Sequence, residues 1–127
     1  MSERIAKIEN ASLGREDHGI LTAFLHVSYG GSGQGIGGYC LDEPIRDADG
    51  KFVGRRGTAY GMEWIKRCID ACGVDTWEQI KGRTILVYFD SDEWSARPIG
   101  IGPLPTERGK PFMFATLKDE LREVGGE

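Results

Sequence analysis

The sequence predicts one α+β domain: an antiparallel sheet of about four to five strands, one main helix packed on it, and a short C-terminal helix. Three observations lead to this prediction. From Ile20 to Tyr29, every second residue is apolar, as in a strand with one buried face. Thr84 to Phe89 is an almost wholly apolar run of strand length. Between them, after Thr58, apolar residues recur at helical spacing.

The first half of the chain supplies the other strands of the predicted hairpins. Residues 4–13 show a loose strand-like pattern, and the polar stretch that ends at Gly19 is typical of a hairpin connection to the next strand. A strand-like pattern resumes at residues 39–42. In the polar connection that follows, Asp49-Gly50 indicates a tight turn at the tip of a second hairpin.

The main helix has signals at both ends. Thr58 is a typical N-cap residue, and Gly73 stands where a glycine commonly follows a helix. The periodicity places four side chains on one face, which we expect to pack on the sheet: Met62, Ile65, Ile69 and Cys72.

After the helix, residues 76–82 predict one short helical turn, and Thr84–Phe89 predicts a central strand covered on both faces. Residues 91–109 read as a loop around a short segment, 99–104. Residues 112–114 predict the last strand, and residues 116–123 the charged terminal helix.

Length and composition bound the class of protein. The 127 residues suit a single domain, residues 1–127, and no linker or internal repeat divides them. No apolar run reaches the roughly 18 residues of a membrane span, and the start of the chain has no signal-peptide core. Three cysteines cannot all pair with one another, which favours a reducing, cytoplasmic location. We therefore expect a cytoplasmic protein without a membrane partner.

The net charge of the chain limits the classes of partner that it is expected to bind. The chain carries 16 Lys and Arg against 20 Asp and Glu, a net charge of −4, which argues against tight binding of duplex nucleic acid. Basic residues gather locally at 51–56 and in the spaced group Arg97, Arg108 and Lys110. Trp94, in a polar loop, is the candidate for contact with a protein partner. A homo-oligomer stays open.

Glycine is the unusual residue, at 19 of 127, and residues 30–38 read Gly-Gly-Ser-Gly-Gln-Gly-Ile-Gly-Gly. This stretch satisfies G-x-G-x-x-G, but a dinucleotide-binding turn must open a helix, and residues 39–44 are no helix start. Two interpretations stay open: a flexible loop or bulged hairpin, or a surface that the backbone of a ligand or partner approaches closely. The second makes four residues candidates for ligand binding: Gly31, Gly33, Gly35 and Tyr39.

A second candidate region is Arg55-Arg56-Gly57-Thr58, directly before the main helix. Helix N-termini attract anions, and arginines bind phosphate with a fork of donors. A nearby tyrosine could lie against a base, so the ligand-binding candidates here are Arg55, Arg56, Thr58 and Tyr60. The alternative is that both arginines are solvated or paired with Asp47 or Asp49.

Catalytic groups are few. The two histidines are His18 and His26, and only Cys40 with His26 could form a nucleophile–base pair on neighbouring strands. Cys40 is more simply explained as a small buried side chain, and Cys68 with Cys72 as core residues of the helix. We therefore expect no enzymatic activity, no metal and no cofactor.

Three blocks of the sequence resemble small bacteriophage and prophage proteins of unassigned function: residues 14–20, 29–41 and 54–63. The resemblance covers about three-quarters of the chain and leaves out residues 92–109. It implies a phage accessory protein, and such proteins often act by occupying a host defence component or a nucleotide signal.

On this basis the chain is expected to be a small non-enzymatic phage accessory protein. In the host cell cytoplasm it would bind a host-defence component, or a nucleotide or other phosphate-bearing signal molecule, and so antagonise host defence. The alternative is a phage DNA-metabolism module that holds single-stranded nucleic acid on its sheet, with Phe24, Tyr29 and Tyr39 as stacking residues. A third hypothesis is an enzyme of unknown type.

Overall fold

The computed structural model describes residues 2–16, 19–93, 95–117 and 119–121. The strands are β1 (Ser2–Glu16), β2 (Ile20–Tyr29), β3 (Ser32–Cys40), β4 (Asp42–Arg46), β5 (Phe52–Gly57), β6 (Thr84–Phe89), β7 (Pro98–Gly102) and β8 (Phe112–Met113). The helix is α1 (Ala59–Ala71), and the short 3-10 turns are η1 (Trp77–Gln79) and η2 (Phe114–Thr116).

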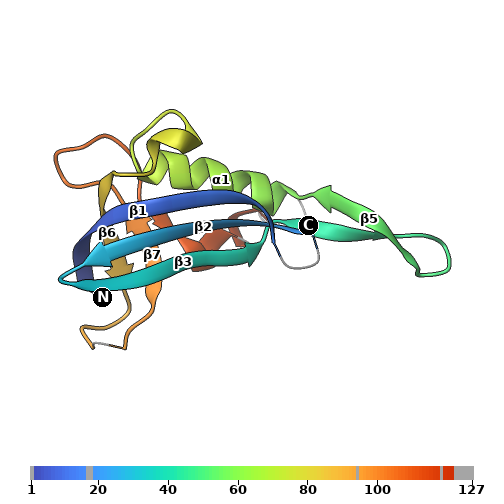
Figure 1. The fold of residues 1–127 in the computed structure, drawn as a ribbon, viewed down its shortest axis with the longest axis horizontal. Coiled ribbons are helices and arrows are strands. Elements are labelled where there is room, and N and C mark those ends of the chain that lie inside the picture. Colours follow the sequence, from blue (N-terminus) through green and yellow to red (C-terminus); the bar gives the residue numbers. More distant parts are fainter. Residues whose placement is uncertain (1, 17–18, 94, 118, 122–127) are drawn as a thin grey trace.

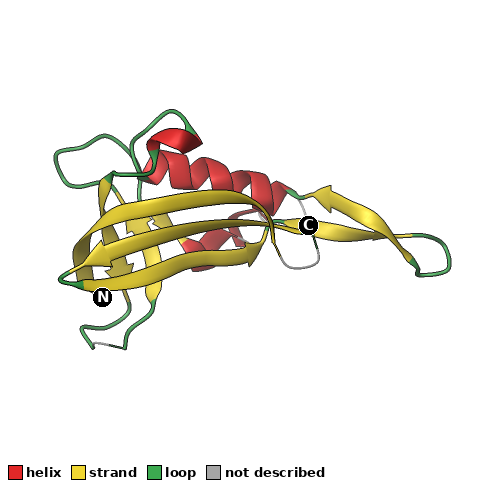
Figure 2. Cartoon of the chain, viewed as in Figure 1, coloured by secondary structure: helices red, strands yellow, loops and turns green. Residues whose placement is uncertain are grey.

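Among the described residues, six strands form one antiparallel sheet in the order β3-β2-β1-β6-β7-β8, and β4 with β5 forms a separate hairpin (Figure 1). The α+β class is confirmed, but the main sheet is larger than the four to five strands predicted. Helix α1 lies across one face of the curved sheet (Figure 2). No helix within the described ranges has the length and apolar character to cross a membrane.

The core lies between this face of the sheet and α1. Every second residue of β2 is buried there, namely Ala23, Leu25 and Val27. In β1 the register shifts between Ile8 and Asn10. This bulge lets Ile8 and, three residues later, Ala11 face the same core, where simple alternation would turn one of them outward.

The prediction for α1 is confirmed at its ends and wrong at one position of its face. Thr58 Oγ1 accepts a hydrogen bond from the Gly61 amide at 2.9 Å, and Gly73, with φ 67°, follows the helix. Met62 was expected in the core but is 68% exposed. The buried stripe is centred instead on Trp64 and Cys68, because the large indole fills the space over the sheet.

The glycine-rich stretch is a bulged hairpin rather than a loop. Gly30 and Gly31 have φ of 53° and 82°, as a two-residue type I′ turn requires. Strand β3 therefore begins at Ser32, seven residues before the predicted start at Tyr39. A Cβ on Gly35 would lie 2.3 Å from Cζ of Phe24, so the Phe24 ring covers this glycine from the neighbouring strand.

Strands β4 and β5 form an arm that projects from the body (Figure 1). The second predicted hairpin is confirmed, with its turn at Asp49-Gly50. Asp47 Oδ1 closes the turn by accepting hydrogen bonds from the amides of Asp49 and Lys51, both at 2.9 Å. Phe52 and Val53 of the arm are exposed.

The second half of the chain largely follows the prediction. Strand β6 is central and buried on both faces, and η1 supplies the short helical turn. Strand β7 starts one residue earlier and ends two residues earlier than the predicted segment 99–104. Residues 117 and 119–121 are helical, whereas residues 122–123 of the predicted terminal helix lie outside the described residues.

We predict that Gly61→Ala destabilises the protein by about 1–3 kcal/mol, although alanine is the better helix former by about 1 kcal/mol. The added Cβ would lie 1.9 Å from the carbonyl oxygen of Leu41, which is backbone and cannot swing away. Urea unfolding measures the change. Gly57→Ala is the control, because a Cβ there meets nothing within 4 Å. A Gly61→Ala variant as stable as the parent would contradict the close contact.

Candidate functional site

Arg55 is held by a carboxylate at the root of the arm. Its Nε and Nη2 donate to Asp42 Oδ1 at 3.0 and 2.8 Å, and the two side chains are only 19% and 10% exposed. Asp42 Oδ1 also accepts from the Leu21 amide at 3.2 Å, which ties the arm to β2. Hydrogen bonding from Arg55 lowers the pKa of Asp42 below its ordinary value. The ion-pair interpretation is therefore right in kind, but the partner is Asp42 rather than Asp47 or Asp49.

The neighbouring candidates also have protein partners. Arg56 Nε donates to Glu43 Oε1 at 3.0 Å on the exposed side of the arm. Thr58 Oγ1 donates to the Leu41 carbonyl at 2.8 Å while it caps α1. These contacts engage part of the donor set of the predicted phosphate site: Arg56 uses its Nε, and Thr58 uses its hydroxyl.

The structure brings the two predicted regions together only in part: the turn end of the glycine-rich stretch lies far from the arginines. Gly31 lies in the β2–β3 turn, nine residues from Cys40, whose Sγ accepts from Arg55 Nη2 at 3.3 Å. At the rise of an extended strand, nine residues span about 30 Å. A single hollow made by Gly31, Gly33 and the arginine pair is therefore excluded by the geometry.

What the fold does assemble is a groove beside the free edge of β3. Its polar half, about 390 Å³, is lined by Gln34, Gly35, Ile36, Gly37, Tyr39, Ser95, Arg97, Pro98 and Phe114. Its apolar half, about 360 Å³, is lined by Tyr39, Tyr60, Pro98, Ile99, Phe114 and Ala115. Because both halves share Tyr39, Pro98 and Phe114, they adjoin, and together we call them the edge groove.

Aromatic side chains make the shared wall rigid. The Tyr39 ring lies 5.7 Å from the fully buried ring of Trp64 and 6.1 Å from that of Phe114. Trp64 and Phe114 stack on each other at 6.0 Å. Tyr39 is nevertheless 39% exposed, so it offers its remaining surface to the groove. Partial burial raises the pKa of Tyr60, on the other wall. Of the predicted ligand-binding residues, Gly35, Tyr39 and Tyr60 line the edge groove.

Arg97 is the cation of the edge groove. Among the described lining residues it alone is positively charged, and no described residue forms a hydrogen bond or ion pair with it. In the sequence, Arg97 stands out only as one member of a spaced basic group. Trp94, the predicted partner contact, lies outside the described residues.

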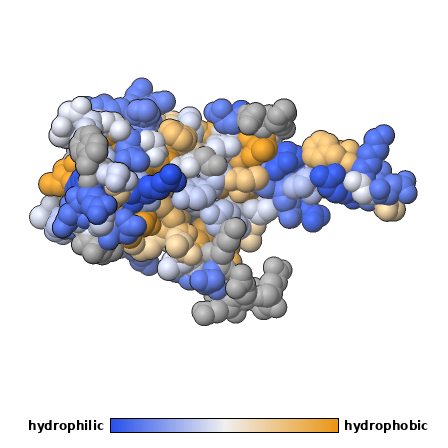
Figure 3. Space-filling model, turned by 90° about the horizontal axis from the view of Figure 1, so that it is seen from below, coloured by the Kyte–Doolittle hydropathy of each residue, from blue (hydrophilic) through white to orange (hydrophobic). Residues whose placement is uncertain are grey.

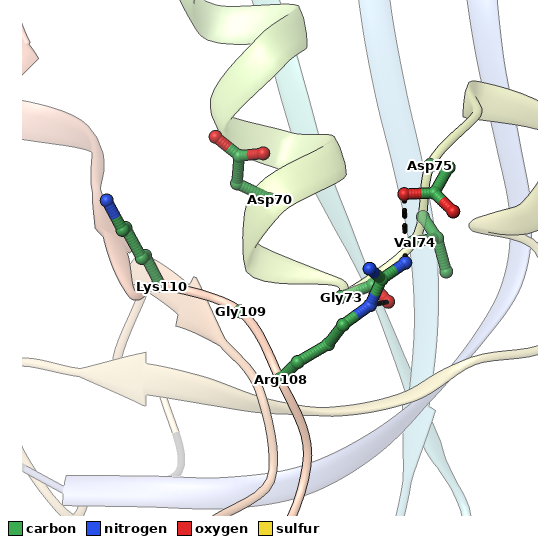
Figure 4. Close-up of a pocket in the computed structure, with 7 residues that line it drawn as sticks. All are labelled: Asp70, Gly73, Val74, Asp75, Arg108, Gly109 and Lys110. Atoms are coloured by element: carbon green, nitrogen blue, oxygen red, sulfur yellow. Dashed lines mark hydrogen bonds and ion pairs between the residues drawn. The ribbon is translucent and has the colours of Figure 1, made fainter.

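Arg108, which belongs to the same spaced basic group, lines a different hollow of about 300 Å³ at the C-terminal end of α1 (Figure 4). Arg108 donates from Nη2 to Asp75 Oδ1 and from Nε to the Gly73 carbonyl, both at 2.9 Å. A Cβ on Gly109 would lie 2.5 Å from the carbonyl oxygen of Asp70. We interpret this hollow as the place where a loop is fastened to the helix end.

The other proposed constellations do not form. Cys40 is exposed, contrary to the expectation of a buried side chain, because it stands at the outer end of β3. It pairs with Thr22 on β2 while His26 pairs with Gly35, which separates the two along β2 by four residues, or about 13 Å. No cluster of three His, Cys, Asp or Glu suited to a metal occurs in the described part of the chain.

The three stacking residues of the nucleic-acid alternative do not share a surface. Tyr39 pairs with Ala23, so it lies on the core face of the sheet, whereas Phe24 points to the opposite face. Tyr29 is half-buried, with its ring edge-on to Phe89 at 5.9 Å. A continuous stacking platform of these three rings is therefore absent.

Comparisons add no relative: no protein-family model, no curated protein and no solved structure matches this chain. The resemblance to phage proteins stays a prediction.

We predict that the stabilising effect of Asp42 disappears in acid. Its pKa is lowered in the folded protein from 3.8, so the carboxylate contributes stability that is complete well above pH 3.8 and is lost as the pH falls through the folded-state value. The difference in free energy of unfolding between the parent and Asp42→Asn should therefore be largest at pH 7 and shrink toward pH 2.5.

Urea unfolding at pH 7, 5, 3.5 and 2.5 provides the measurement, and the exposed Asp92→Asn is the matched control. A difference for Asp42→Asn that stays constant over this range would show that its carboxylate is not ion-paired.

We also predict that one thiol of the three reacts rapidly with dithionitrobenzoate at pH 8. Cys40 is exposed, whereas burial raises the pKa of the Cys72 thiol to about 12 and that of Cys68 well above its ordinary value. Unfolding in urea should expose the other two thiols to the reagent. Rapid reaction of all three in the native protein would place the inner face of α1 outside the core.

Proposed function

We propose that this chain is a small non-enzymatic binding protein that holds an extended segment of a partner protein as an additional strand on the free edge of β3. The observation that carries the proposal is an edge strand without charged residues or proline, with a groove beside it. In this mode, main-chain hydrogen bonds supply affinity and pockets for alternate side chains supply specificity.

The edge of β3 has little of the protection that edge strands commonly carry. Within the described residues β3 pairs with β2 alone. Residues 30–40 contain no Asp, Glu, Lys, Arg or Pro, which are the residues that commonly keep edge strands from pairing with other chains. The register shift beside Gly37 is the one such device on this strand.

The surface around this edge agrees with a binding role. Strand β3 is the lowest of the three front strands in Figure 1, so the view from below in Figure 3 faces its free edge. The middle of the body in that view is pale and orange, between blue regions at one end and along the arm. An extended peptide docked here would meet backbone and weakly polar surface rather than a dense layer of charge.

A peptide suits the edge groove better than a nucleotide. A phosphate chain carries several charges and is usually met by several donors. The described lining residues offer one cation, Arg97, and the start of α1 is already capped by Thr58. A peptide backbone is neutral and obtains its hydrogen bonds from the strand itself. The geometry therefore favours a protein partner over a nucleotide-like ligand.

The same residues support binding without catalysis. The described side chains that line the edge groove include no His, Cys, Asp or Glu, the residue types that most often transfer protons or act as nucleophiles. The remaining reactive groups are the hydroxyls of Ser95, Tyr39 and Tyr60. That the partner is a host-defence component, and that the chain comes from a phage, stay predictions.

The proposal is tested with a randomised heptapeptide library selected on the purified protein, followed by hydrogen exchange with one enriched synthetic peptide. We expect amides in residues 32–37 that face the free edge to exchange about tenfold more slowly when the peptide is bound, because new strand pairing protects them. Strand β8, at the other edge of the sheet, should be unaffected.

Peptides N-methylated at alternate amides supply the control. Methylation of the amides that face β3 should abolish binding, and methylation of the amides that face away should leave binding unchanged. Equal effects of both sets, or strong thermal stabilisation by a nucleotide panel with no peptide selected, would contradict strand addition and favour the nucleotide alternative.

A further inference from the structure

We infer that the edge groove selects its partner strand by two side chains two positions apart: an acidic one in the polar half and an aromatic or large aliphatic one in the apolar half. This inference rests on the proposed function and specifies the chemistry of the partner. It follows from the different linings of the two halves and from the spacing of residues along a strand.

The polar half is built for a carboxylate. Arg97 is exposed and has no hydrogen-bond or ion-pair partner among the described residues, unlike Arg55 and Arg108, whose guanidinium groups bind carboxylates of this chain. A free guanidinium presents parallel donors that match a carboxylate in a two-point contact. Gln34 Oε1 already accepts from the Tyr29 hydroxyl at 2.9 Å, so its amide contributes N–H donors to the same half.

The apolar half has no charged lining among the described residues. Tyr60, Ile99 and Ala115 surround it, and Tyr39 and Phe114 separate it from the polar half. Because the ring of Tyr39 is fixed against the buried Trp64, this wall cannot collapse into the space. An aromatic or large aliphatic side chain would cover the exposed part of Tyr39 and gain the free energy of removing apolar surface from water.

The spacing links the two halves. Side chains at positions i and i+2 of a strand point to the same side and lie about 7 Å apart. Both halves border Tyr39, Pro98 and Phe114, so two such side chains of one docked strand reach one half each. The preference for an acid runs against the net charge of −4, so it must arise locally at Arg97.

Fluorescently labelled peptides test the inference: Thr-Thr-Glu-Thr-Trp-Thr-Thr and Thr-Thr-Trp-Thr-Glu-Thr-Thr, which cover both strand directions. Each is compared with versions that carry Lys for Glu or Ala for Trp. Anisotropy titrations at 50 mM salt use the parent protein, Arg97→Glu and the matched control Arg15→Glu. Arg15 is an exposed arginine of β1 that likewise has no hydrogen-bond or ion-pair partner among the described residues.

In one of the two orders, the parent should bind the Glu peptide about tenfold more tightly than the Lys peptide, as one charge-assisted contact implies. Arg97→Glu should reverse this preference, and Arg15→Glu should keep it. Replacing Trp by Ala should weaken binding about tenfold in both the parent and the variants. Circular dichroism confirms that each variant is folded.

The outcomes separate the inference from the proposed function. Suppose that library-selected peptides protect β3, but the Glu and Lys peptides bind the parent equally, or Arg97→Glu weakens the binding of both without reversing the preference. Then the inferred preference for an acidic and an apolar side chain is wrong, and strand addition stands. If no peptide protects β3, the proposed function is wrong, and the inferred side-chain preference is wrong with it.

Discussion

The fold depends on one close contact, between the start of α1 and the backbone at Leu41. Thr58 Oγ1 donates to the Leu41 carbonyl, and Gly61 brings the helix against the same oxygen because it has no Cβ. Tyr39 precedes this contact by two residues, and Tyr60 is next to Gly61. The junction therefore sets the distance between two walls of the edge groove, and any side chain at position 61 would move them apart.

Much of the fold was predictable because its signals are local. The alternation in β2, the apolar run of β6 and the end signals of α1 each lie within one element. Strand β3 was missed from Ser32 onward because glycine is poor in strands when judged by itself. What stabilises it is the ring of Phe24 on the adjacent strand, placed over Gly35, and a sequence pattern within β3 does not report a neighbour's side chain.

The site was predicted only in part, for the same reason. Tyr39, Tyr60 and Gly35 do line the edge groove, but the carboxylate that binds Arg55 depends on the register of the arm, and so Asp42 was not foreseen. Arg97 lies about sixty residues after the edge strand that it faces. Only the curvature of the sheet brings residues 95–99 beside β3, and curvature leaves no periodic trace in the chain.

The arm has a consequence for how this protein can vary. Its turn is closed by Asp47, its root is closed by Asp42 and Arg55, and the ladder between them touches solvent along most of both faces. Adding or removing two residues on each side of the ladder preserves the in-and-out alternation at both closures, because the side-chain period of a strand is two. The arm can thus become longer or shorter in steps while the core and the edge groove keep their geometry.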